Sequence, residues 1–73
     1  MEAKYGIGDI LQVFLVSGLH HVLIEEIKVQ SICVDVDYYT EFQYYNYTIL
    51  ETGLRGMFDT HCIDGDPLTR LVA

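Results

Sequence analysis

The strongest secondary-structure signal in this chain is the segment Phe42-Gln43-Tyr44-Tyr45-Asn46-Tyr47-Thr48-Ile49-Leu50. Its aromatic and β-branched side chains suit a pleated, half-buried surface better than a helix, so the stretch predicts a central strand. With a period of two residues, both faces of that strand are largely apolar. A strand of this kind needs cover on both sides, which predicts a small closed barrel or a partner chain.

The residues on either side of this segment favour further strands and turns. An apolar run over 9–16 predicts a first strand, residues 37–41 a polar and aromatic connection, and residues 51–56 a glycine-flanked hairpin turn. Alternation over 57–63 predicts a fourth strand, and residues 68–72 predict a helical turn followed by a short last strand. The chain is therefore expected to be all-β, either a small barrel or a strongly bent antiparallel sheet of about five strands.

The segment from Leu19 to Ile32 is ambiguous. Its first apolar residues fall at helical spacing after a plausible cap at Ser17, which favours a helix. Gly18 in the first turn disfavours that helix, and the continuing run of isoleucine and valine favours a long strand. We predict a strand and keep the helix as the alternative.

The order of these elements resembles that of small SH3-like barrels. The resemblance rests on Gly8-Asp9-Ile10, on the run 21–27, on the segment 45–50 and on the end of the chain from Ile63 to Val72. It implies a scaffold used for binding and assembly, although a fold alone assigns no function. The segment between Lys28 and Glu41 departs from a compact barrel, so an inserted hairpin or a partner-binding arm is expected there. The chain is also similar to small proteins of marine tailed phages.

Size and composition favour association with a second copy. The 73 residues make one domain, expected to span 1–73, and 51% of them are hydrophobic. A core this small cannot enclose all the apolar side chains, so some apolar surface remains exposed. A symmetric interface would bury that surface. We expect a homo-oligomer.

The net charge of −7 disfavours nucleic acid and anionic membranes as partners. It permits a basic protein partner, which makes an acidic inhibitor of a basic host protein an alternative function. The apolar run 10–19 lacks the basic start of a signal peptide and is too short to span a bilayer. The chain is therefore expected in the cytoplasm, or in the host cytoplasm if it is viral.

Histidine and cysteine define a second alternative, a metal-binding protein. Its ligands would come from His20, His21, His61 and Cys62, although adjacent residues on a strand point to opposite faces. Cys33 and Cys62 are otherwise expected as reduced, buried thiols. Neither cysteine has a recognisable base with an orienting group, so no catalysis and no cofactor are expected.

Tyrosine supplies the expected binding surface. The cluster has two interpretations, a core that continues into an oligomer interface or a groove for a peptide, and the net charge disfavours stacking on nucleic-acid bases. The leading hypothesis is a noncatalytic structural or protein-interaction module that self-associates. Its candidate residues are Tyr38, Tyr39, Tyr44, Tyr45 and Tyr47.

Overall fold

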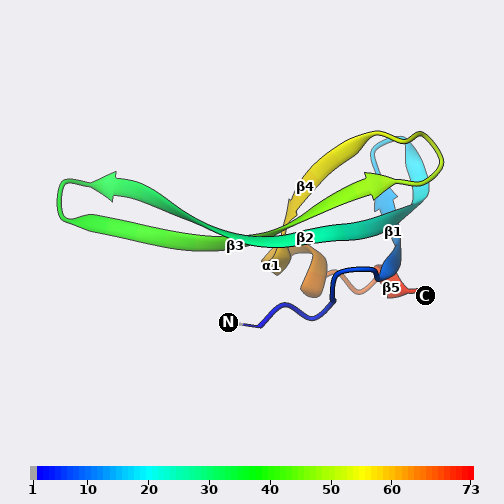
Figure 1. Cartoon of the computed structure of the whole chain (residues 1–73), viewed down its shortest axis with the longest axis horizontal. Helices are drawn as coiled ribbons and strands as arrows, with labels where there is room; N and C mark the ends of the chain where they lie inside the picture. The colour runs from blue at the N-terminus through cyan, green and yellow to red at the C-terminus, as the bar shows by residue number, and fades with distance from the viewer. Residues whose placement is uncertain (1) are drawn as a thin grey trace.

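A computed structural model describes residues 2–73 and shows one antiparallel sheet with a single short helix (Figure 1). The prediction of an all-β chain is confirmed. The strands lie in the order β4-β3-β2-β1-β5. The elements are β1 (Ile10–Leu15), β2 (Gly18–Asp35), β3 (Tyr38–Ile49), β4 (Arg55–Asp59), α1 (Thr60–Asp64) and β5 (Arg70–Leu71).

The sheet is open, because β4 and β5 lie at its opposite edges and pair only with β3 and β1 respectively. The prediction of a closed barrel is wrong. The alternative was a strongly bent antiparallel sheet of about five strands, and the antiparallel sheet of five strands is confirmed. The physical reason is the length of the edge strands. β5 has only two residues, paired as Leu11↔Leu71 and Gln12↔Arg70, and offers too few backbone groups to close the sheet.

The hydrophobic core covers one face of the sheet. Register places Leu11 opposite Val22 and Ile24 opposite Tyr47, so side chains of β1, β2 and β3 meet there. Tyr5 from the N-terminal segment and Ile63 from α1 cover this face. The buried apolar residues are Tyr5, Leu11, Val13, Val22, Ile24, Tyr45 and Ile63.

The segment from Leu19 to Ile32 lies entirely within β2, so the strand prediction is confirmed and the helix alternative is wrong. Gly18 begins the strand with φ of 120°, a conformation that a side chain disfavours. β1 pairs with the first part of β2, and β3 pairs with almost all of it. These ladder hydrogen bonds and the burial of Val22 and Ile24 outweigh the helical spacing.

The β2–β3 hairpin continues far beyond the core. We call residues 28–43 the arm; they comprise the ends of β2 and β3 and the turn at Val36-Asp37. It gives the molecule an extent of 43 Å along one axis and about half that along the others (Figure 1). The predicted connection over 37–41 was wrong for Tyr38–Glu41, which are strand residues paired with β2.

The predicted fourth strand over 57–63 is correct only as far as Asp59. The Asp59 carboxylate accepts a 2.8 Å hydrogen bond from the backbone N–H of His61, which caps α1, and the N–H of Gly65 closes the helix on the carbonyl of His61. This local capping outweighs the alternating pattern. The last strand expected near the C-terminus is present as β5.

Candidate binding surfaces

The arm exposes apolar side chains on both faces. Residues 28–41 are all exposed, and only Phe42 and Gln43 at the base are half-buried. One face continues the core face of the sheet, and the other carries the rings of Phe42 and Tyr44, with centroids 5.6 Å apart. Large exposed hydrophobic residues of the arm are Val29, Ile32, Val34, Val36, Tyr38 and Tyr39.

A hollow of about 440 Å³ lies where the arm joins the body. Val29 and Phe42 form its apolar part, and Asp59 and His61 border it from the end of β4 and from α1. The Thr60 hydroxyl donates a 3.3 Å hydrogen bond to Oε1 of Gln43, which ties α1 to the base of the arm. The arm therefore leaves the body beside a concave, mixed surface.

The five candidate tyrosines divide between core and surface. Tyr38 and Tyr39 in the arm are 60% and 65% exposed, whereas Tyr45 is fully buried and so is not part of an exposed surface. Tyr44 and Tyr47 are half-buried. The sequence could not assign the faces of β3, because both are apolar. The structure brings Tyr45 and Tyr47 to the core and leaves Tyr38 and Tyr39 exposed in the arm.

Tyr45 also links three parts of the chain. Its hydroxyl donates a 2.6 Å hydrogen bond to Oδ1 of Asp64 and accepts a 3.2 Å bond from the N–H of Tyr5. Burial and, next in size, the Asp64 bond raise the pKa of the Tyr45 hydroxyl to about 12. The Asp64 carboxylate also accepts a bond from the N–H of Lys4. This buried polar group fixes the N-terminal segment and α1 against β3.

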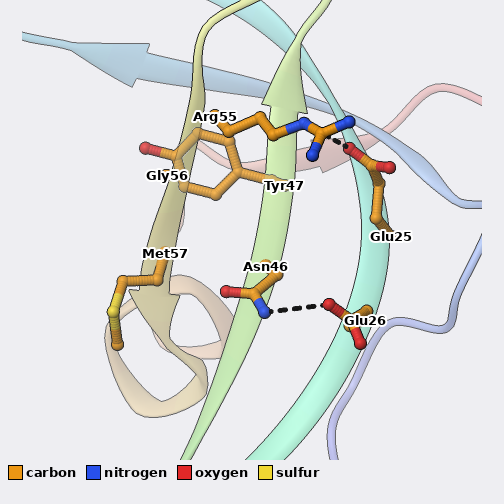
Figure 2. Close-up of a pocket in the computed structure, with 7 residues that line it drawn as sticks. All are labelled: Glu25, Glu26, Asn46, Tyr47, Arg55, Gly56 and Met57. Carbon is orange, nitrogen blue, oxygen red and sulfur yellow. Dashed lines mark hydrogen bonds and ion pairs between the residues drawn. The ribbon is translucent and has the colours of Figure 1, made fainter.

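A second hollow, of about 490 Å³, has an acidic wall (Figure 2). The register of β2 shifts between Ile24 and Glu26, and this β-bulge turns the carboxylates of Glu25 and Glu26 toward the same neighbouring strand. Asn46 donates a 3.2 Å hydrogen bond to Glu26, and the Thr48 hydroxyl donates one to Glu25. Two adjacent carboxylates beside a hollow can receive a cationic side chain.

The other side of that hollow lies at the edge of the sheet. Arg55 approaches Glu25 only to 4.0 Å, and its side chain remains highly exposed. The side chain of Tyr47 lies over Gly56, its partner on β4. Its ring stacks on Phe58 with ring centroids 4.1 Å apart. Tyr47 lines the hollow, and Phe58 holds the Tyr47 ring by stacking on it. Sequence spacing alone did not reveal this arrangement, because it depends on a glycine opposite a tyrosine.

His20 and His21 gather around Glu51 rather than around a metal-ligand set. The N–H of His21 donates a 2.8 Å hydrogen bond to Glu51, and its ring lies 2.6 Å from the other carboxylate oxygen. These bonds, the backbone one first, lower the pKa of Glu51 to about 2. The His20 ring lies 3.5 Å from the same carboxylate. Glu51 was not among the residues singled out from sequence.

His61 and Cys62 lie on α1, apart from the His20 and His21 pair. Within residues 2–73 no group of three or more histidine, cysteine, aspartate or glutamate side chains could hold a metal ion. The metal-binding alternative therefore has no supporting geometry in this part of the chain. Cys33 and Cys62 are free, as expected, but both are exposed, so the prediction of burial was wrong.

Comparison with protein-family models, with curated proteins and with solved structures gave no match. None of the helices described in residues 2–73 has the length and apolar character needed to cross a membrane.

Proposed function

We propose that this chain is a noncatalytic protein-interaction module that associates with a second copy of itself, and that the arm is its binding element. The observation that carries the proposal is the exposure of six large hydrophobic side chains on a hairpin that projects from a folded body. Apolar patches of this kind on a small chain mark interaction sites.

The physical state of the arm supports this function. A two-stranded ribbon without cover is only marginally stable in water, because few of its side chains leave the solvent. Each large apolar side chain that a partner covers completely contributes roughly 1.5–3 kcal/mol. A partner would thus stabilise the arm and gain affinity from the same contacts.

The SH3-like assignment is part of the proposal. It is supported by the meander of β2, β3 and β4, by the helical turn between β4 and β5, and by the pairing of β5 with β1. The helix lies at Thr60–Asp64, earlier than the helical turn expected within 68–72. The open sheet and the long β2–β3 hairpin would then be departures that convert a compact scaffold into one with an arm.

Sedimentation velocity over a range of concentrations tests the function. We expect the mass to rise from 8.4 kDa toward twice that value at high micromolar concentration. The double variant Tyr38→Ser, Tyr39→Ser should lose association and keep its fold, because both side chains are exposed. Leu54→Ser, an exposed apolar residue outside the arm, is the matched control and should associate normally. A wild-type monomer at all concentrations rejects the proposal.

A second candidate function is the inhibition or binding of a basic protein. The specific observation that favours it is the pair of carboxylates at Glu25 and Glu26 beside the second hollow, on a chain with a net charge of −7. Binding to a basic partner should weaken steeply with salt. The double variant Glu25→Gln, Glu26→Gln should bind more weakly, whereas Glu2→Gln, which removes one charge outside this hollow, should have a small effect.

A further inference from the structure

One edge of the arm is a strand edge without a neighbour. β4 pairs with β3 only from Tyr44 to Thr48, so the edge of β3 from Tyr38 to Gln43 is not paired within residues 2–73. An exposed edge of this kind is a template for another strand. The edge is also flanked by the exposed rings of Tyr38 and Tyr39.

The hydrogen-bonding direction of each residue on this edge follows from the base of β3. The N–H of Ile49 donates to Leu54 on the β4 side, and the N–H of Leu50 donates to His21 on the β2 side. Backbone groups alternate in this way along a strand, and β3 carries no inserted residue in its register. Tyr39 and Glu41 therefore direct their N–H and C=O groups outward, away from β2.

We propose that a second copy of this chain pairs with this edge, strand against strand and antiparallel, with Thr40 on the two-fold axis. The inference rests on the proposed self-association and adds the surface and register by which it occurs. Tyr39 would exchange both backbone hydrogen bonds with Glu41 of the other copy, and the reverse pair would do the same. The two arms would form one four-stranded sheet.

The charges select this register. Because paired residues must point to the same face, the axis has to pass through a residue and not between two residues. An axis at Glu41 sets two Glu41 carboxylates opposite each other, and an axis at Tyr39 sets Glu41 opposite Asp37. Like charges directly opposite destabilise a sheet. An axis at Phe42 would bring the partner against β4, which occupies the edge from Tyr44 onward.

The side chains that meet across an axis at Thr40 complement each other. Tyr38 lies opposite Phe42, and Thr40 lies opposite Thr40, which are favourable cross-strand pairs. Tyr39 lies opposite Glu41, where a phenol can donate to a carboxylate. The two-fold axis generates the Tyr38–Phe42 pair twice, once on each side of the axis. The pairing therefore buries the arm's aromatic residues symmetrically.

The opposite edge of the arm is less suited to a partner. The register of β2 shifts between Cys33 and Asp35, so a β-bulge interrupts that edge. Bulges of this kind block the addition of another strand.

Pairing along β3 alone closes after two copies and gives a dimer, not a fibre. The contact covers on the order of 500 Å² per copy, less than a standard interface, so the dimer is expected to be weak and concentration-dependent.

Disulfide cross-linking tests the register. In a background with Cys33→Ser and Cys62→Ser, Thr40→Cys places two thiols on the axis at a Cα separation of about 4.5 Å, which suits a disulfide. Ser31→Cys is the matched control, because Ser31 lies on the β2 edge outside the contact and its own copy lies three strand spacings, about 14 Å, away. Mild oxidation should cross-link Thr40→Cys at least about tenfold faster than Ser31→Cys, since only the first pair meets the geometric requirement.

Proline substitution tests the edge. Glu41→Pro removes an outward N–H from the β3 edge, and Ser31→Pro removes one from the directly opposite position on the β2 edge. Both variants also lose the 3.5 Å contact between these side chains. Glu41→Pro should weaken dimerisation at least about tenfold despite the loss of a negative charge, and Ser31→Pro should leave it within about twofold.

The outcomes separate this inference from the proposed function. If the wild-type chain dimerises while Thr40→Cys cross-links no faster than Ser31→Cys, or while Glu41→Pro dimerises as well as Ser31→Pro, the edge pairing is rejected and self-association stands. If the wild-type chain remains a monomer at high micromolar concentration, both are rejected. Circular dichroism of each proline variant checks that the sheet is retained. If Glu41→Pro unfolds, it is replaced by Tyr39→Pro, which must also weaken dimerisation.

Discussion

The hydroxyl of Tyr45 donates a 2.6 Å hydrogen bond to the Asp64 carboxylate, joining the buried middle of β3 to the last residue of α1. Because the same oxygen accepts the N–H of Tyr5, a single side chain holds the segments that precede and follow the sheet. The core is therefore small and specific, and the arm lies outside it. This arrangement separates the residues that maintain the fold from those available for binding.

Tyr45→Phe should destabilise the chain without changing its association. The variant keeps the buried ring and removes one donor and one acceptor, so it leaves the Tyr5 N–H and the Asp64 carboxylate short of a partner. We expect a loss of about 1–3 kcal/mol in the free energy of unfolding. Urea denaturation measures it, with Tyr44→Phe as the control on the opposite face of β3. An equal loss in both variants would contradict the role given to the Tyr45 hydroxyl.

Alkaline pH should remove the stabilisation that Tyr45 contributes. Its folded pKa is raised from 10.0 to about 12, so the contribution is fully present below pH 10 and is lost as the pH rises toward 12. The contribution of Tyr45 to the free energy of unfolding falls by at most about 1.4 kcal/mol per pH unit. The difference in stability between the wild-type chain and Tyr45→Phe should therefore shrink between pH 10 and 12. A difference that stays constant over that range argues against the raised pKa.

Gly56→Ala should displace Tyr47, which lines the second hollow. Gly56 lies opposite Tyr47, and a Cβ there would collide with the hydroxyl and ring of that tyrosine. We expect a loss of about 1–3 kcal/mol, with displacement of Tyr47 from its stack on Phe58. Gly6→Ala is the matched control, since a Cβ there meets only the Asp9 carboxylate at 3.8 Å. Thermal melts and near-ultraviolet circular dichroism would reveal both effects, and equal stability of the two variants would refute the clash.

Salt should distinguish the two candidate functions. Two copies with a net charge of −7 each repel one another, so added salt should strengthen self-association. A basic partner is attracted by the same charge, so salt should weaken that complex. Sedimentation and pull-down experiments provide the comparison between about 50 mM and 500 mM salt. Over that range the Debye length shortens severalfold. Dimerisation that weakens with salt would contradict an interface formed by apolar side chains and backbone bonds.

Much of the sheet could be predicted from local sequence. The aromatic and β-branched run over 42–50 lies in β3 up to Ile49, and residues 19–32 lie in β2. These segments follow β-propensity because tertiary pairing reinforces it. The turn before β4 was also expected, and Gly53 occupies it with φ of 75°. Local preference and final structure agree in these places.

The remaining features depend on contacts that the sequence does not display. Alternation over 57–63 predicted a strand, but residues 60–64 form a helix that Asp59 caps at its start and Gly65 caps at its end. The available sequence signal was an aspartate and a glycine on either side of five residues. The burial of Tyr45 required knowing which face of β3 meets α1. The arm was foreseen only as a departure from a compact barrel, since its length depends on pairing between distant residues.

Sedimentation of an armless chain tests whether the arm mediates association with a second copy. Residues 31–41 would be replaced by Asn-Gly, a turn that suits the hydrogen-bonded pair Gln30↔Phe42. At high micromolar concentration the wild-type chain should sediment toward twice 8.4 kDa, and the armless chain should remain a folded monomer. Equal mass for the two folded proteins, whether monomer or dimer, would contradict the claim.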